Sequence, residues 1–208
     1  MLLETGTVGT VGNGTYSCRR SAWPTNLNLI ITIGVYTIDA GLDTGDILLQ
    51  KEIPIAPSDT AVTLAPRMAS IGADLMVETL RRLKAGTVHP QPQDYAKATL
   101  APILKKEDGE VDFQRTAQEI LNRLRGFQSW PGAYTSFRGK NLHIWAAQPI
   151  ECAVAAGELL VENGLLIVGC GGGSALQLLE VQLEGKKRMP AADFVHGYQP
   201  RTGEILGN

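Results

Sequence analysis

The stretch "DAGLDTGDILL" (residues 39–49) sets three aspartates among small residues and then runs into an apolar segment. Gly41 and Gly45 permit tight turns that bring the main chain close to a ligand. The apolar residues after the loop predict a strand, and a loop on a rigid sheet is a common place for catalytic residues. We therefore take Asp43, the central aspartate of the loop, as the first candidate catalytic residue.

The sequence on either side of this loop predicts part of an α/β domain. Residues 28–38 are β-branched and alternating, which predicts a strand that leads into the loop. Residues 46–55 predict a strand that leads out of it. A helix is predicted at about 66–85, with Pro66 near its start and Gly86 at its end.

The predicted helix has two further signals. Ser58 or Asp59 can cap its N-terminus, because a side-chain oxygen there can accept from a free backbone N–H group. Aliphatic side chains recur mostly at intervals of three or four residues, which predicts that they share one face of the helix. They are Leu64, Met68, Ile71, Leu75, Val77, Leu80 and Leu83.

The second half of the chain predicts a linker followed by a small β-rich domain. Proline-rich residues 88–104 predict an extended linker, and residues 115–127 predict a short amphipathic helix. Hairpins are predicted around Gly139-Lys140 and around Asn163-Gly164, and a further strand and a final helix or tail follow. One helix and about five short strands are typical of a small barrel such as an OB-fold.

Composition excludes several classes of protein. The chain has 208 residues, of which 44% are hydrophobic and 19% charged, as in an ordinary globular protein. Its net charge of −2 predicts no general attraction to nucleic acid, so any such binding depends on local patches. Cys18, Cys152 and Cys170 lack metal-ligand spacing, and no apolar run approaches the roughly 20 residues that span a membrane. We expect a cytoplasmic protein without a metal.

Three groups of cations and one aromatic segment are candidate contacts for RNA. Lys105 and Lys106, Arg123 and Arg125, and Lys186, Lys187 and Arg188 form the three basic groups. They would bind RNA only if folding gathers them on one side, and a solvated surface is the alternative. The segment at 126–137 carries Phe127, Trp130, Tyr134 and Phe137, and is interpreted either as a core anchor or as a stacking surface for bases.

The acidic loop and the glycine run each have alternative interpretations. Asp43-Thr44-Gly45 is also the signature of aspartic proteases, in which two such loops share a proton, so a homodimer could supply both. Three solvated turn aspartates are a further alternative. Residues 169–175, "GCGGGSA", lack the pattern and the following helix of a phosphate loop, and predict a hairpin connection. None of His89, His143 and His196 is assigned as the partner of Asp43.

Collinear motifs in both halves resemble the methionyl-tRNA formyltransferase family, from about residue 33 to about residue 200. The motifs are "IDAGLDTGDILLQKEIPI" (38–55), "ADLMVETLRRLKAG" (73–86), "ATLAPILKKEDGEVDF" (98–113), "NRLRGFQSWPGAY" (122–134) and "LLEVQLEGKKRM" (178–189). The "GLDTGDIL" loop is shared with other folate-dependent formyltransferases. The Lys-Lys-Glu-Asp-Gly and Trp-Pro-Gly-Ala elements point to the tRNA enzyme.

The resemblance implies formyl transfer from 10-formyltetrahydrofolate to the amino group of methionyl initiator tRNA. In that family an Asn and a His stabilise the oxyanion, and an Asp orients the His; Asp43 falls on that Asp. The segment Ile38, Asp39, Ala40, Gly41 and Leu42 would contact the pterin through its main chain. The resemblance assigns the basic residues at 105–106, 123, 125 and 186–188 to tRNA binding.

The resemblance also implies the domain order. Residues 1–28 match no part of the family and are compatible with disorder. Residues 29–87 form an α/β remnant of a Rossmann-like formyltransferase domain, 88–108 a linker, and 109–208 a small OB-like β-barrel domain that contacts tRNA. The family's Asn-x-His segment, followed by Ser-Leu-Leu-Pro, is absent. One lost oxyanion donor costs about 10²–10³ in rate, so we expect this chain alone to be an inactive transferase.

Overall fold

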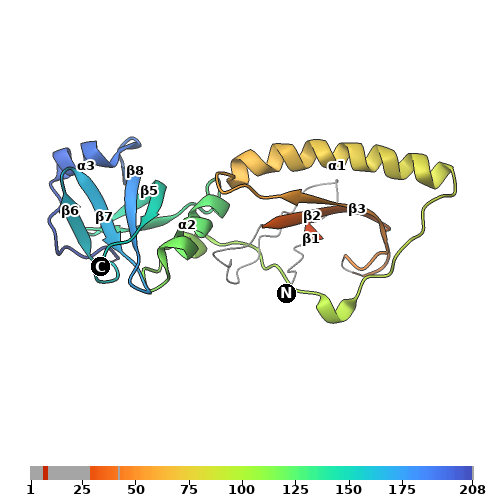
Figure 1. Cartoon of the computed structure of the whole chain (residues 1–208), viewed down its shortest axis with the longest axis horizontal. Helices are drawn as coiled ribbons and strands as arrows, with labels where there is room; N and C mark the ends of the chain where they lie inside the picture. Colours follow the sequence, from red (N-terminus) through yellow and green to blue (C-terminus); the bar gives the residue numbers. More distant parts are fainter. Residues whose placement is uncertain (1–6, 9–28, 42, 208) are drawn as a thin grey trace. The chain divides into compact units, whose positions relative to one another are not determined.

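The computed structural model describes residues 7–8, 29–41 and 43–207. Contacts divide the chain into two compact units that meet in the sequence between Ile103 and Leu104. Each unit contains a β-sheet and at least one α-helix, so the fold is mixed α/β (Figure 1). Apart from Thr7 and Val8, the segment expected to be unmatched lies outside the described residues, as does Leu42.

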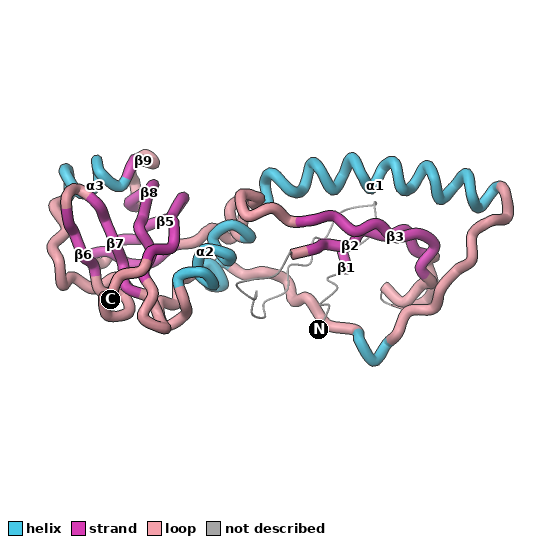
Figure 2. The backbone as a smooth tube through the Cα atoms, in the orientation of Figure 1, coloured by secondary structure: helices cyan, strands magenta, loops and turns pink. Residues whose placement is uncertain are grey.

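The described part of the first unit is a three-stranded sheet with one long helix. Strand β1 (Thr7–Val8) pairs in parallel with β2 (Ile30–Tyr36), and β2 pairs antiparallel with β3 (Ile47–Pro54). Helix α1 (Ala61–Lys84) runs along one face of the sheet (Figure 2). The two strands and the helix predicted around the acidic loop are thus all present, and the loop is the connection between β2 and β3.

Helix α1 begins earlier than predicted. Thr60 is its N-cap and forms a capping box with Thr63, so the expectation of a cap at Ser58 or Asp59 was wrong. Asp59 instead accepts from the Ala56 N–H at 2.7 Å and pairs with Arg67 at 2.7 Å. Pro66 lies inside the helix and not at its start. The reason is that two neighbouring groups occupy the Asp59 carboxylate, while Thr60 is free to cap.

Only the first part of the predicted apolar face is a core face. Leu64, Met68, Ile71 and Leu75 pack against the sheet residues Ile31, Ile33 and Ile53. Thr79 continues this face, fully buried, with its hydroxyl donating to the Leu75 carbonyl at 2.7 Å. Val77, Leu80 and Leu83 are 47%, 58% and 46% exposed, so the prediction that they share one face with the buried residues was wrong. Val77 and Leu80, two and five residues beyond Leu75, turn away from that face, whereas Leu83, four residues beyond Thr79, is in line with it but stays exposed.

The second unit is built on a six-stranded antiparallel sheet. Its elements are α2 (Ala117–Gly126), β4 (Tyr134–Phe137), β5 (Lys140–Ile150), β6 (Leu159–Glu162), β7 (Leu165–Gly169), β8 (Ala175–Leu183), β9 (Met189–Pro190) and α3 (Ala191–Tyr198). The strand order is β4-β5-β8-β7-β6, and β9 pairs with β8. Among the described strands no pairing joins β4 to β6, so the ladder is open at both ends.

Local sequence signals account for the connections in this unit. Asn163 and Gly164 both have positive φ, 50° and 78°, and turn β6 into β7 as predicted. The β4–β5 hairpin turns at Arg138-Gly139, one position earlier than predicted, and the glycine run joins β7 to β8. Helix α2 starts at a capping box between Thr116 and Glu119. Hydrogen bonds from Thr116 to the Glu119 carboxylate lower the pKa of Glu119.

The core of the second unit lies between its sheet and its helices. Its fully buried side chains include Phe194 of α3, Leu142 of β5 and Leu178 of β8. Along β5 burial alternates, so Leu142 and Ile144 face the core while His143 and Trp145 face the other way and are half-buried. The rings of His143 and Trp145 therefore lie on the outer side of the sheet, away from the core.

Candidate functional site

The acidic loop of the first unit folds back on Asp39. One Asp39 carboxylate oxygen accepts from the Gly41 N–H at 3.0 Å and from the Thr44 hydroxyl at 2.5 Å. An aspartate carboxylate that accepts hydrogen bonds from residues a few positions later in the chain is typical of Asx turns. Asp39 therefore shapes the loop, and its carboxylate is occupied by the loop itself.

Asp43 occupies the tip of this loop in a left-handed conformation, with φ of 55°. That region is unusual for a residue other than glycine, although aspartate tolerates it better than most. Within the described ranges its side chain is exposed and forms no hydrogen bond or ion pair. Burial, and to a smaller extent the Asp43 charge, raise the pKa of Tyr36 in the adjacent strand. The Asp43 carboxylate is thus free to meet a partner.

Residues beyond α1 hold the loop in place. The Gln93 side-chain amide donates to the carbonyls of Asp43, at 2.9 Å, and Gly45, at 2.7 Å. The Tyr95 hydroxyl donates to the Thr44 carbonyl at 3.3 Å. Main-chain bonds of 2.8 and 2.9 Å between Ile47 and Gln91 anchor the same segment to β3. The first part of the predicted linker is therefore bound to the candidate site.

Sequence reasoning did not identify Gln93 and Tyr95 as loop contacts. They lie about 50 residues beyond the loop, in a stretch whose prolines indicate an extended linker. A half-buried glutamine whose amide donates to two carbonyls leaves no recognisable pattern in the residues around it. Only the fold, which returns the chain from the end of α1 to β3, places them there.

Replacing Gln93 by Ala removes both amide bonds, and we expect the loop to open more often. At ~0.5–1.5 kcal/mol per hydrogen bond, backbone exchange at residues 37–47 should speed up by about 5- to 150-fold. Hydrogen exchange measured by mass spectrometry reports this rate. Gln91→Ala is the matched control, because Gln91 bridges to Ile47 through its main chain. Equal exchange in both variants would contradict the assignment of Gln93.

The predicted pterin-contacting residues lie beside Asp43. Ile38, Asp39, Ala40 and Gly41 are all exposed, and Ile38 is 94% exposed. The structure places them and Asp43 on one loop. No group of three or more His, Cys, Asp or Glu side chains that could hold a metal occurs in the described part of the chain. No described helix is long and apolar enough to cross a membrane.

One Asn-x-His sequence does occur in the chain, at Asn141-Leu142-His143. It lies in β5, where it pairs with both β4 and β8, and Ile-Trp follows it in place of Ser-Leu-Leu-Pro. It belongs to the second unit, whereas Asp43 belongs to the first. We therefore do not assign it as the partner of Asp43.

Of the seven cations predicted to contact RNA, two bind neighbouring groups of the protein and five are exposed. Arg123 is half-buried and donates to the Asp108 carbonyl at 2.8 Å, with its guanidinium 5.0 Å from the centre of the Phe127 ring. Arg125 donates to the Asn122 side chain at 3.4 Å. These two arginines support the local fold. The other five predicted RNA contacts, Lys105, Lys106, Lys186, Lys187 and Arg188, are exposed.

The aromatic residues of the segment at 126–137 differ in burial. Phe127 and Phe137 are buried, 6% and 3% exposed, as a core anchor would be. Trp130 is 57% exposed, and the half-buried Tyr134 ring lies 5.8 Å from the imidazole of His143. The core-anchor interpretation is therefore confirmed for the two phenylalanines, and the stacking interpretation stays a prediction for Trp130 and Tyr134.

Comparison with known sequences identifies similar proteins over most of the chain. Residues 29–80 match the family model "Formyl transferase", and residues 103–199 match "Formyl transferase, C-terminal domain". A methionyl-tRNA formyltransferase of Koribacter versatilis is 61% identical over 170 residues, covering 82% of this chain and 54% of that protein. One from Geobacter metallireducens is 43% identical over 195 residues, covering 91% and 62%. The chain spans about half the length of the curated relatives it matches.

Solved structures share the fold at lower identity. HypX from Aquifex aeolicus, in complex with tetrahydrofolic acid, is 19% identical with a TM-score of 0.56, covering 84% of this chain and 31% of that one. The N-formyltransferase from Helicobacter canadensis, in complex with folinic acid and dTDP-3-aminofucose, is 19% identical with a TM-score of 0.54, covering 72% and 55%. These likenesses show the fold.

Proposed function

Because the chain belongs to the formyl transferase family, we propose that it supplies the Asp43 loop and the tRNA-binding part of a methionyl-tRNA formyltransferase. The observation that carries this proposal is the Asp43 loop itself. An exposed carboxylate stands at its tip, and Gln93 and Tyr95 from a distant segment hold the loop by donating to its main-chain carbonyls. The high identity to relatives of that name, over both units, supports the same reaction.

In the proposed reaction the amino group of methionyl initiator tRNA attacks the formyl carbon of 10-formyltetrahydrofolate. The carbon–nitrogen bond to the folate then breaks, and the amine proton passes to the folate nitrogen. An Asn and a His would stabilise the oxyanion, and Asp43 would orient the His and favour its charged form. The segment at 38–42, of which residues 38–41 are exposed, would receive the pterin. The folate ligands of the HypX and Helicobacter canadensis structures support that donor.

The residues of this chain supply only part of that machinery. An Asn-x-His followed by Ser-Leu-Leu-Pro does not occur among the 208 residues, so the proposal assigns formyl transfer to a protein in which such a segment faces Asp43. On its own this chain should bind tRNA without transferring a formyl group. A non-catalytic tRNA-binding module is therefore the second candidate function. The family membership leaves the aspartic protease interpretation without support.

The proposal includes the finer domain assignment. Residues 29–87 would be the remnant of a Rossmann-like catalytic domain, and residues 109–208 an OB-like domain that contacts tRNA in the cytoplasm. The five antiparallel strands β4 to β8, with α2 before them, support the second assignment. Exposed Lys105, Lys106, Lys186, Lys187 and Arg188 would contact phosphates.

Salt dependence of tRNA binding tests this part of the proposal. Each phosphate contact contributes about 0.7–0.9 to the slope of log affinity against log salt. We expect replacement of both Lys186 and Lys187 by Ala to lower that slope by about 1–2, measured by fluorescence anisotropy with labelled initiator tRNA. Lys51→Ala, an exposed lysine of β3, is the control. An unchanged slope in the double variant would remove these lysines from the interface.

A further inference from the structure

The outer face of β5 presents a row of aromatic rings. Tyr134 of β4 lies opposite His143 of β5, and their ring centres are 5.8 Å apart. The His143 and Trp145 rings are stacked, with centres 6.4 Å apart and an interplanar angle of 30°. The register of β5 against β8 shifts between Ile144 and Ala146, which places a bulge at Trp145. Such bulges redirect a side chain and are common beside functional sites.

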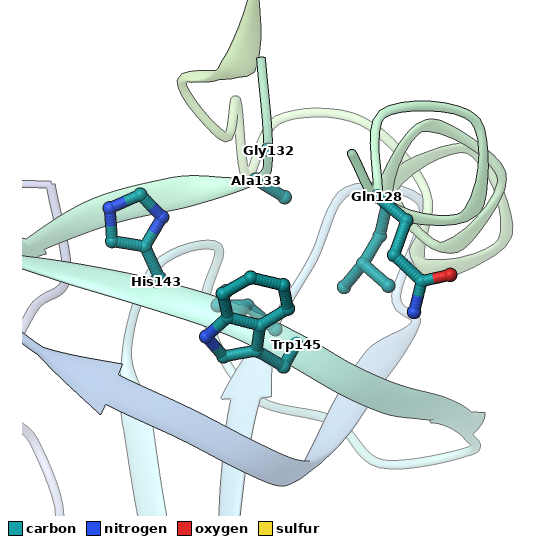
Figure 3. Close-up of a pocket in the computed structure, with 7 residues that line it drawn as sticks. Gln128, Gly132, Ala133, His143 and Trp145 are labelled. Carbon is teal, nitrogen blue, oxygen red and sulfur yellow. The ribbon is translucent and has the colours of Figure 1, made fainter. Parts of the chain in front are cut away.

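Hydrogen bonds fix the position of the Trp145 ring. Its indole N–H donates to the Gln182 side-chain oxygen at 3.0 Å, and the Gln182 amide donates to the Lys186 carbonyl at 2.9 Å. The indole N–H group therefore already has its hydrogen-bond acceptor within the protein. Figure 3 shows His143 and Trp145 on the same side of β5, with Gln128, from the segment after α2, beside the same pocket. Leu124, Gly132, Ala133 and Ile144 complete the lining of this shallow pocket.

Cations border this row of rings. The Arg188 guanidinium lies 5.0 Å from the centre of the Trp145 ring, pairs with Glu180, and keeps 47% of its side chain exposed. Burial, and secondly the Lys106 charge, lower the pKa of His143, which favours the neutral form of its imidazole. A neutral ring stacks on a base without the desolvation cost of a charged one. The face therefore combines flat rings with cations beside Trp145 and His143, while the carboxylates of Glu107 and Glu110 act on Tyr134.

We propose that this aromatic row, defined as Tyr134, His143 and Trp145, binds an unpaired nucleobase of RNA. The base would stack against His143 and Trp145, and Lys106 and Arg188 would contact the flanking phosphates. Rings bordered by cations are the pattern of single-strand binding surfaces, where each stacked base contributes about 1–3 kcal/mol. The identity of the RNA as tRNA rests on the proposed function, whereas the stacking site rests on the rings and charges alone.

Binding of a short single-stranded RNA and of initiator tRNA to the full chain tests the proposal. Trp145→Leu keeps an apolar side chain but removes the π-face, so affinity for both RNAs should fall by about 5- to 150-fold. Trp145→Phe should recover most of the loss. The salt slope should stay unchanged in Trp145→Leu and fall by about 1 in Lys106→Ala. Leu165→Ala is the control, because it removes exposed apolar surface at a residue outside the row and outside every candidate RNA contact.

The outcomes separate this inference from the proposed function. If the chain binds tRNA with a steep salt slope and Trp145→Leu binds as tightly as the original chain, the stacking site is overturned and the function stands. If single-stranded RNA binds in a Trp145-dependent manner while tRNA does not bind, the site stands and the function fails. A concentration-dependent dimer that Trp145→Leu abolishes, without any effect on RNA, would assign the row to a second copy and overturn the proposal.

Discussion

Asp43→Asn should lower kcat/KM for formyl transfer by about 10²–10⁴-fold in an enzyme that contains the complete site, the range expected for loss of an acid–base partner. Such an enzyme can be made by joining residues 29–208 to the N-terminal half of the Koribacter versatilis relative, which is 61% identical over the shared part. The amide of Asn keeps the size of the carboxylate but loses the charge. It can no longer favour the protonated histidine, so the effect should fall on kcat with little change in the affinity for tRNA.

Formation of formylmethionyl-tRNA, followed under conditions limiting in tRNA, measures this effect. Asp74→Asn is the control, because Asp74 is an exposed carboxylate on α1 remote from the loop in sequence. Asp43→Glu tests geometry, since it retains the charge on a longer side chain. Activity of Asp43→Asn within a factor of about two of the unmodified enzyme would show that this carboxylate has no part in the chemistry.

Leu178→Ala should strongly destabilise the second unit, and the neighbouring residue of the same strand offers a matched control. Leu178 is 1% exposed and lies in the middle of β8 within the core cluster, so its truncation leaves a cavity. Leu→Ala changes at such sites reduce the free energy of unfolding by about 2–5 kcal/mol. Leu179, the next residue of β8, is 38% exposed on the other face. Leu179→Ala should cost less than about 1 kcal/mol.

Urea unfolding of the full chain, followed by tryptophan fluorescence, compares the two variants. Both carry the same chemical change in neighbouring positions of one strand, so any difference in strand propensity between Leu and Ala cancels. The remaining difference is burial alone. Equal losses of stability in the two variants would mean that the alternation of burial along β8 is not what holds this unit together.

Several elements were predictable because their signals are local. The Asn163-Gly164 turn needs two residues that adopt positive φ, and that dipeptide supplies them. Helix α2 was predicted from the spacing of its apolar residues, and its capping box lies within four residues of sequence. Of the strands that flank the acidic loop, the first was predicted from alternation and the second from its apolar run. In each case the deciding interaction joins residues close together in the chain.

Predictions failed where two segments compete for the same group or face. The start of α1 was misplaced because Arg67 and Ala56 occupy the Asp59 carboxylate, which left the cap to Thr60. Leu83 has the spacing of the buried face that carries Met68 and Thr79, yet it stays 46% exposed. Periodicity identifies an apolar face, but only the partner decides how much of it is buried.

By itself the sequence determined the family, the acidic loop with Asp43 at its tip, and the order of the elements. Motifs, turns and periodicities of this kind are set by neighbouring residues. Only the tertiary structure decided that Gln93 holds the Asp43 loop and that His143 and Trp145 share an outer face bordered by Arg188. The Gln93 bonds reach 50 and 48 positions back along the chain, and Arg188 lies 43 positions beyond Trp145, so these groups come together only when strands pair and the chain returns from a helix.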